Sequence, residues 1–308
     1  MFKLILLLTI PFYFSFANTV VIKQLQEEFN KNVLETNIFR KRFDSYLTKT
    51  CQDDFECLRK QINYLKKWDT VQNDESLKKL IKNNSSLFEL DTTYWEKVQQ
   101  KLQTKKIKLT KSQFLSVIDL NSQLFILTFW DESTNSFHYI GKDLISSGDI
   151  SRESEIKFGE DHYLKTPQGI FSTQTGWRSD GSSKDDNVTL GYGHKDRYVF
   201  YFGKHKTIRY NTFDKEKNKI YDSNKWQLIT DELNLALHSH KSSKPMGVAA
   251  SHGCIRMSDE LNRFIDTNLV LHKNMFQGKK WLHKYSKEPT QAKHYNYAGE
   301  YLIIFDNI

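Results

Sequence analysis

The sequence has no long apolar run after residue 17, no internal repeat and no low-complexity tract. The first absence excludes a membrane span from the rest of the chain, because a bilayer-crossing helix needs about 20 apolar residues. Glycine and proline are also missing from Asn18 to Lys108. Apolar residues recur in that stretch at three- and four-residue steps, so the sequence predicts a helical region there.

The first 17 residues form a short apolar run behind Lys3, which Pro11 interrupts. Small residues follow at Ser15 and Ala17. This pattern is typical of a secretory signal that is cut after Ala17. An uncleaved anchor is the alternative, but the run is short for a span. We therefore expect export, with no stable membrane span once the signal is removed.

The formal net charge is +8. Charge of this kind indicates partners rather than fold. An exported basic protein could meet an anionic polymer, lipid head groups or cell wall, whereas nucleic acid is not expected outside the cytoplasm. The basic residues are spread along the chain, so an ordinary solvated surface explains the charge about as well.

There are three cysteines, and export changes how they are interpreted. Cys51 and Cys57 lie in "CQDDFEC", and in an oxidising compartment this pair predicts a local disulfide. Cys254 is then left without a partner in the sequence. A lone thiol in an exported protein is expected to be either buried or used chemically.

The character of the sequence changes near Leu109, where β-rich runs replace the helical pattern. We predict an α+β chain with four parts: a signal peptide at 1–17, a helical N-terminal domain at 18–108, a mainly β domain at 109–270, and a C-terminal extension at 271–308 that packs on it. The polar, glycine-containing stretch Thr175–Arg197 is predicted to be a long loop that acts as a lid. Trp177 and Tyr192 lie in it.

The stretch "ASHGCIRM", residues 250–257, gathers chemically active residue types. In one interpretation Cys254 is a thiolate nucleophile, His238 or His252 is its base, and Arg256 lowers the thiol pKa. The small residues around the cysteine, Gly253 among them, let backbone N–H groups approach a reacting carbonyl as an oxyanion hole.

Two other interpretations stay open on the residues alone. His238, His240, His252 and Cys254 are suitable ligand types for zinc, although the chain lacks H-E-x-x-H and Arg256 is unfavourable beside a metal ion. Alternatively the histidines are ordinary polar residues and the thiol is part of the core.

The motif around Cys254 resembles the signature of the L,D-transpeptidase (YkuD-type) catalytic domain. It consists of His238, a gap of a dozen residues, and then Ser251-His252-Gly253-Cys254-Ile255-Arg256. The segments "SVIDLNSQLFIL" and "KTPQGIF" also look like that family. The resemblance covers roughly residues 112–270. It implies a mainly β, sandwich-like catalytic domain with a few helices.

The resemblance also implies roles for individual residues. The catalytic group would be Cys254 as nucleophile, His238 as base, Ser239 as the residue whose carbonyl holds the imidazole, and His252 with Gly253 as site wall and oxyanion region. Substrate contacts would come from Arg256, Ser251 and the lid residue Tyr192. His240 has no certain counterpart and is expected to face solvent.

The activity that the resemblance implies is acyl transfer on peptidoglycan stem peptides in the periplasm, with no cofactor and no metal. Cys254 would form a thioester at meso-diaminopimelate and release D-alanine. An acceptor amine would then form a crosslink. Hydrolysis of the same bond, as in an L,D-carboxypeptidase, is the alternative. A zinc-dependent wall hydrolase and a non-catalytic wall-binding protein are less favoured.

Overall fold

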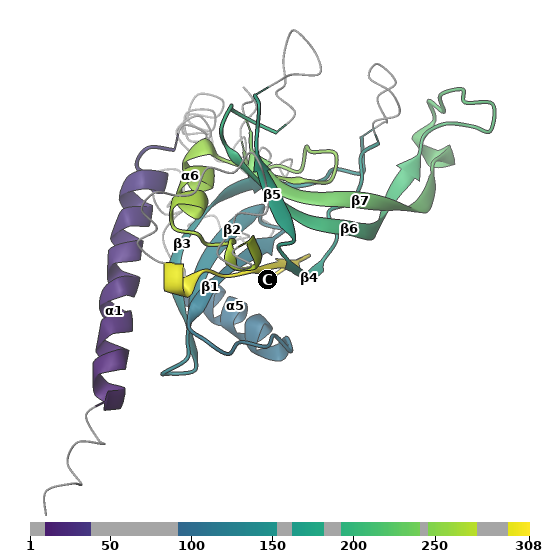
Figure 1. The fold of residues 1–308 in the computed structure, drawn as a ribbon. Helices are drawn as coiled ribbons and strands as arrows, with labels where there is room; N and C mark the ends of the chain where they lie inside the picture. Colours follow the sequence, from purple (N-terminus) through teal and green to yellow (C-terminus); the bar gives the residue numbers. More distant parts are fainter. Residues whose placement is uncertain (1–9, 38–91, 153–161, 182–191, 241–245, 276–294) are drawn as a thin grey trace, which may run out of the picture.

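The computed structural model describes residues 10–37, 92–152, 162–181, 192–240, 246–275 and 295–308 (Figure 1). Within these ranges one curled mixed sheet has the strand order β4-β9-β1-β2-β3-β8-β7-β6-β5. The strands are β1 (Gln113–Asp119), β2 (Leu124–Asp131), β3 (Ser136–Ser146), β4 (Gly169–Ser172), β5 (Thr175–Arg178), β6 (Tyr198–Asn211), β7 (Gln227–Ser239), β8 (Ile255–Met257) and β9 (Tyr301–Phe305). The α-helices are α1 (Ile10–Phe29), α5 (Thr92–Thr104) and α6 (Asp259–Thr267), and a π-helical turn, Asn30–Leu34, continues α1. The prediction of a mainly β α+β fold is confirmed.

The central strands β1 and β2 are buried at every position. Their sequences are almost continuous apolar runs, as expected for strands that are covered on both faces. One face packs against the larger core, which includes Phe114 and Phe125. The other face packs against a second core that includes Val98 and Leu102 of α5.

Helix α1 packs against the sheet. Its residues Leu25 and Phe29 are fully buried in the larger core, and the Phe29 ring occupies the space beside Gly141 of β3 that a β-carbon would need. Asn18 Nδ2 donates to Asp131 Oδ1 over 2.8 Å. The predicted cleavage point after Ala17 lies inside α1, so the first residue beyond it already contacts the sheet.

Much of the predicted helical domain, Cys51 and Cys57 included, lies outside the described residues. Across the ranges that are described, no helix combines the length and apolar character needed to cross a membrane.

The C-terminal strand β9 lies inside the sheet. It pairs in parallel with β1 on one side and antiparallel with β4 on the other. The extension predicted to pack on the β domain therefore supplies an interior strand, and β4 is joined to the sheet through it.

One loop prediction needs correction. The stretch Thr175–Arg197 begins with strand β5, which pairs antiparallel with β6, so its first four residues belong to the sheet. The charged stretch 213–226 is the end of the long β6–β7 hairpin, which extends away from the rest of the molecule (Figure 1). Helix α6 follows the cysteine motif, and Ser258 Oγ accepts the N–H of Leu261 as its N-cap.

Candidate active site

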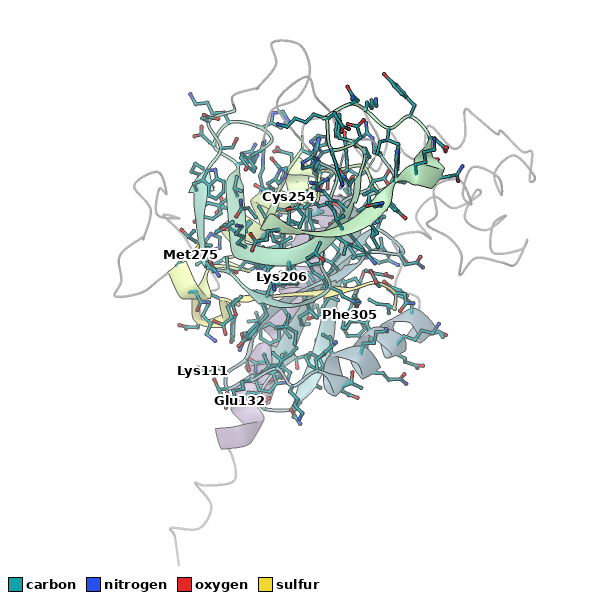
Figure 2. All side chains as sticks on the ribbon, turned by 90° about the vertical axis from the view of Figure 1, so that its right-hand side faces the viewer. Lys111, Glu132, Lys206, Cys254, Met275 and Phe305 are labelled. Atoms are coloured by element: carbon teal, nitrogen blue, oxygen red, sulfur yellow. The ribbon has the colours of Figure 1, made fainter. Side chains whose placement is uncertain are left out.

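Strand alternation brings the histidine and cysteine of the motif to one face of the sheet. Strands β7 and β8 run parallel, with Leu237 opposite Ile255 and His238 opposite Arg256. Leu237 and Ile255 are in the larger core. Because successive side chains of a strand point to opposite faces, His238 and Arg256 lie on the face opposite to Leu237 and Ile255. Cys254 is two residues before Arg256, which is the repeat of side-chain direction in a strand. In Figure 2, Cys254 lies in the half of the molecule away from Lys111 and Glu132.

Cys254 is half-buried immediately before β8. Its Sγ lies 3.3 Å from the carbonyl oxygen of Asn234 in β7, to which the thiol donates. Burial raises the pKa of the Cys254 thiol above its ordinary value, and a hydrogen bond from the backbone of Ala236 and the charge of Arg256 oppose that rise. The resting group is therefore a thiol, which needs a base to become a nucleophile.

His238 is buried, and its Nδ1 lies 2.7 Å from the carbonyl oxygen of Ser239. Burial, together with the charge of Arg256, lowers the pKa of His238 to about 4, and the hydrogen bond to Ser239 partly opposes these two effects. The imidazole is therefore neutral near pH 7. A carbonyl can only accept, so Nδ1 carries the proton and Nε2 keeps the lone pair that a general base requires.

The loop that carries Cys254 is held by internal hydrogen bonds. Ser251 Oγ donates to the carbonyl of Cys254 and accepts the N–H of Gly253 over 3.0 Å. Gly253 has a φ of +132°, and a β-carbon there would lie 2.8 Å from the Leu233 side chain. Ser251 is only 1% exposed, so its hydroxyl supports the loop, in contrast to the predicted substrate contact.

Thr166 supports the same loop from behind. Its Oγ1 donates to the carbonyl of Gly253 over 2.6 Å and accepts the N–H of Gly148 over 2.9 Å. The sequence pointed to this threonine through its Thr-Pro segment but gave it no role. Its position shows that the segment before β4 fixes the backbone next to Cys254.

His252 contacts the segment that precedes β4, and its carbonyl accepts the N–H of Leu164. Its ring stacks on Tyr163 with centroids 4.1 Å apart and planes 20° apart. The guanidinium of Arg152 lies over the other ring of this stack, 4.5 Å from the centroid of Tyr163. Sequence reasoning missed both Tyr163 and Arg152, because neither belongs to a recognisable motif.

An aromatic wall covers His238. Tyr192, 42% exposed, meets the imidazole edge-on at a centroid distance of 5.2 Å, and Trp177 meets Tyr192 edge-on at 5.4 Å. Burial raises the pKa of the Tyr192 phenol, and the nearby charge of an ionised Cys254 raises it further. Of the two aromatic residues expected in the lid, Tyr192 therefore lies against the histidine and Trp177 lies against Tyr192.

Gly193 explains why Tyr192 can lie there. Its φ is +84°, and a β-carbon at this position would lie 2.1 Å from Ser239 Oγ. The backbone thus passes directly over Ser239, which places Tyr192 against the neighbouring His238.

His240 is the clearest error among the histidine predictions. It was expected to face solvent but is 5% exposed, and its N–H donates to the carbonyl of Met257. Among the residues that the structure describes, no three His, Cys, Asp or Glu side chains form a group suited to a metal ion.

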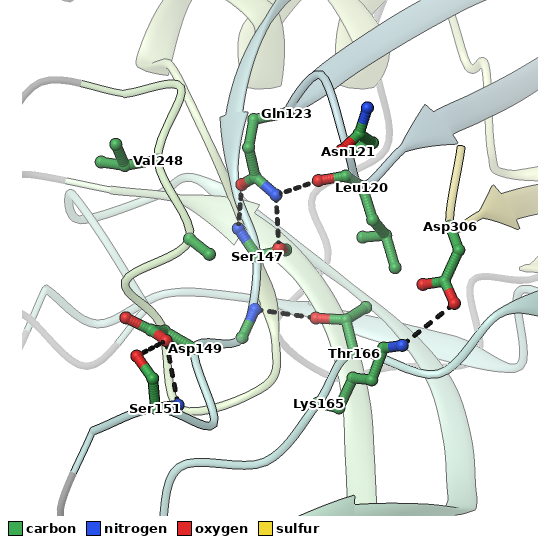
Figure 3. Close-up of a pocket in the computed structure, with 12 residues that line it drawn as sticks. Leu120, Asn121, Gln123, Ser147, Asp149, Ser151, Lys165, Thr166, Val248 and Asp306 are labelled. Atoms are coloured by element: carbon green, nitrogen blue, oxygen red, sulfur yellow. Dashed lines mark hydrogen bonds and ion pairs between the residues drawn. The ribbon is translucent and has the colours of Figure 1, made fainter. Parts of the chain in front are cut away.

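A polar cavity of about 700 Å³ lies behind the cysteine loop (Figure 3). Gln123 joins its walls by donating to Ser147 Oγ and accepting the N–H of Ser147. Lys165 Nζ pairs with Asp306 Oδ2 across it at 3.0 Å. The cavity wall includes Gly148 and Thr166, so it is separated from the Cys254 thiol by the residues that support the loop.

Comparisons with known proteins agree with the motif. A family model described as the L,D-transpeptidase catalytic domain (YkuD) matches residues 113–270. The comparison with curated proteins returned no match.

Three solved structures illustrate the more distant similarities. Bd1075 of Bdellovibrio bacteriovorus is 16% identical with a TM-score of 0.31, and the match covers 64% of this chain and 49% of that one. An L,D-transpeptidase from Xylanimonas cellulosilytica is 16% identical with a TM-score of 0.30, and the match covers 68% of this chain and 69% of that one. A fused Zn-dependent amidase/peptidase/peptidoglycan-binding protein from Clostridium acetobutylicum is 12% identical with a TM-score of 0.28, and the match covers 70% and 63%. The chain thus spans about half the length of the Bdellovibrio protein.

Proposed function

Because the chain belongs to the L,D-transpeptidase (YkuD) catalytic-domain family, we propose that it catalyses cysteine-dependent acyl transfer on peptidoglycan stem peptides. The observation that carries the proposal is the pairing of His238 Nδ1 with the Ser239 carbonyl. This contact leaves Nε2 unprotonated on the face of the sheet that Cys254 shares.

The proposed reaction begins when His238 Nε2 removes the proton from the Cys254 thiol. The thiolate attacks the carbonyl of the L-centre of meso-diaminopimelate, and the C–S bond forms as an oxyanion develops. The N–H of Gly253 is directed at Ser251, so the backbone N–H of Cys254 itself is our candidate donor to this oxyanion.

Collapse of this intermediate breaks the C–N bond. His238 returns its proton to the departing nitrogen, and D-alanine leaves while a thioester remains on Cys254. We propose that an acceptor amine from a second stem peptide resolves the thioester and forms a crosslink. Water in place of the amine would give a trimmed tripeptide, which is the carboxypeptidase outcome.

The test is D-alanine release from disaccharide tetrapeptide, followed by mass spectrometry with and without an acceptor stem peptide. We expect release by the wild type, none by Cys254→Ala, and a loss of about 10²- to 10⁴-fold for His238→Ala, as for removal of a general base. His138→Ala is the matched control, because His138 pairs with Phe129 at a distant part of the sheet.

Unchanged release by Cys254→Ala would reject the proposal. Release of D-alanine without any crosslinked product in the presence of acceptor would assign the carboxypeptidase activity instead. Loss of activity with a chelator but not with a thiol alkylator would favour a zinc hydrolase, and binding to sacculi without turnover would favour a wall-binding protein.

A further inference from the structure

The face of β7 that carries His238 continues well beyond the candidate active site. Side chains of a strand repeat their direction every two residues, so His238, Asn234 and Leu228 lie on one face of β7. At about 3.4 Å per residue, Leu228 is about 34 Å along the strand from His238. This outer part of β7 belongs to the β6–β7 hairpin, which extends away from the rest of the molecule (Figure 1). The face that carries the proposed base therefore leads onto a surface that the proposed chemistry does not use.

A series of contacts joins this surface to the histidine. Tyr192 meets His238 edge-on, and Trp177 meets Tyr192. The ring centroid of Trp177 also lies 6.3 Å from that of Tyr201 in β6. The Tyr201 hydroxyl donates to Asn234 Oδ1 over 3.1 Å. The surface is thus continuous from the aromatic wall beside His238 to the beginning of the hairpin.

The two faces of the hairpin differ in exposure. One face packs against the segment before β4 and the cysteine loop: Thr207 Oγ1 donates to the carbonyl of Lys165, and Leu233 lies beside Gly253. The other face, here called the open face, is the one that continues from His238. Its β7 residues are all exposed: Leu228, Thr230, Glu232 and Asn234. Their partners in β6 complete the open face: Lys204, Lys206, Ile208 and Tyr210.

The open face combines positive charge with apolar groups. Lys204 forms an ion pair with Glu232. Lys206 lies opposite Glu232, is exposed and has no ion-pair partner among the described residues. Two lysines and one glutamate therefore leave this face net positive. Further out, Tyr210 lies opposite Leu228, which is 53% exposed. Ammonium groups attract carboxylates, and aromatic and aliphatic side chains supply apolar contact area.

We propose that the open face of the β6–β7 hairpin binds a further stretch of the peptidoglycan strand that carries the stem peptide to be cut. The inference rests on the proposed function. Three residues precede the cut bond of a tetrapeptide stem, and they span at most about 11 Å. Leu228 lies about three times as far from His238, so only a longer substrate reaches it. Neighbouring stems of the strand supply carboxylates for Lys206, and its sugar rings supply apolar faces for Leu228.

The test compares D-alanine release by the intact chain from two substrates at equal stem concentration: the disaccharide tetrapeptide, and uncrosslinked glycan chains that carry the same tetrapeptide. For the wild type we expect a higher kcat/KM per stem on the glycan chains. A variant that combines Lys206→Gln and Leu228→Ser should lower kcat/KM on the glycan chains by about 5- to 30-fold, as for loss of one exposed charge contact and one apolar contact. Its kcat/KM on the disaccharide tetrapeptide should be unchanged, which also shows that the variant is folded.

Two single variants are the matched controls. Lys97→Gln removes an exposed lysine from α5, which packs against the second core away from the hairpin. Gln227→Ser changes an exposed residue that is next to Leu228 but on the opposite face of β7. Both variants should keep the wild-type ratio of kcat/KM between the two substrates.

Three results would overturn the inference: equal kcat/KM per stem on both substrates in the wild type, an equal loss on both substrates in the combined variant, or the same loss on the glycan chains in a control variant. In each of these cases, D-alanine release from the disaccharide tetrapeptide by the wild type would leave the proposed function intact. Absence of release from both substrates would remove the proposed function, and this inference with it.

Discussion

Thr166 Oγ1 donates a 2.6 Å hydrogen bond to the carbonyl oxygen of Gly253, the residue that precedes Cys254. That carbonyl and the N–H of Cys254 belong to the same peptide unit. Because the peptide bond is planar and trans, fixing the carbonyl also fixes the direction of the N–H on the other side. Thr166 therefore orients the N–H that we propose as the oxyanion donor, without contact with the substrate.

We expect Thr166→Val to lower kcat by about 10- to 100-fold with a small effect on KM, because complete removal of an oxyanion donor costs about 10²- to 10³-fold. Thr166→Ser should restore most of the activity. Thr173→Val is the matched control: its hydroxyl, also on a residue that is 1% exposed, donates to the carbonyl of Glu300 away from the loop. Similar kinetics for the two valine variants would contradict the proposed role of Thr166.

The dependence of kcat/KM on pH should show that the His238 imidazole is neutral near pH 7. The pKa of His238 is lowered to about 4, so the base is protonated, and kcat/KM falls, only as the pH drops through that value. Arg256→Gln removes a cation that disfavours both the imidazolium and the protonated thiol, so the pKa values of His238 and Cys254 should both rise. The acid limb should therefore move to higher pH. A wild-type acid limb near pH 6.5, the ordinary histidine value, would contradict this assignment.

Gly193→Ala should lower both stability and kcat/KM. The new methyl group would collide with Ser239 Oγ and would also meet an unfavourable positive φ, so the backbone must move and carry Tyr192 away from His238. Gly181→Ala is the control, since Gly181 also has a positive φ but packs against Lys195. We expect comparable losses of melting temperature and a loss of activity only in Gly193→Ala, measured by thermal melts and D-alanine release. Equal activity in both variants would show that the Tyr192 contact is unimportant.

Strand β9 lies outside the family match, yet it should determine stability. Ile304 is buried and pairs with both β1 and β4, so Ile304→Ala should lower the free energy of unfolding by about 2–5 kcal/mol. Ile170→Ala, at a 38% exposed position on the edge strand β4, should cost less than about 1 kcal/mol. Urea denaturation of both variants measures the difference. Equal losses would mean that β9 is only loosely attached.

The sequence predicted the parts of the fold that depend on local pattern. Strands β1 to β3 follow from the β-rich runs of apolar residues alone. It also predicted the residues of the Cys254 motif and the histidine of β7, because strand alternation and a fixed spacing connect them.

What the sequence did not predict depends on contacts between distant segments. The position of β9 between β1 and β4, the burial of His240 and the support of Gly253 by Thr166 all join residues far apart in the chain. The convergence of Arg152 and Arg256 on Ala250 is of the same kind, since Arg152 belongs to no motif and only the folded loop brings it there.

The position of β9 also has a kinetic consequence. Residues 116–119 pair in parallel with residues 302–305, which is a contact of very large sequence separation. Such pairings form slowly, because the loop-closure entropy must be lost before the contact is gained. Strand β4, and with it the segment that carries Thr166, has no place in the sheet until β9 arrives. A nascent chain that lacks β9 should therefore hold an unformed active site, and catalytic competence should appear late in folding, together with the closure of the sheet.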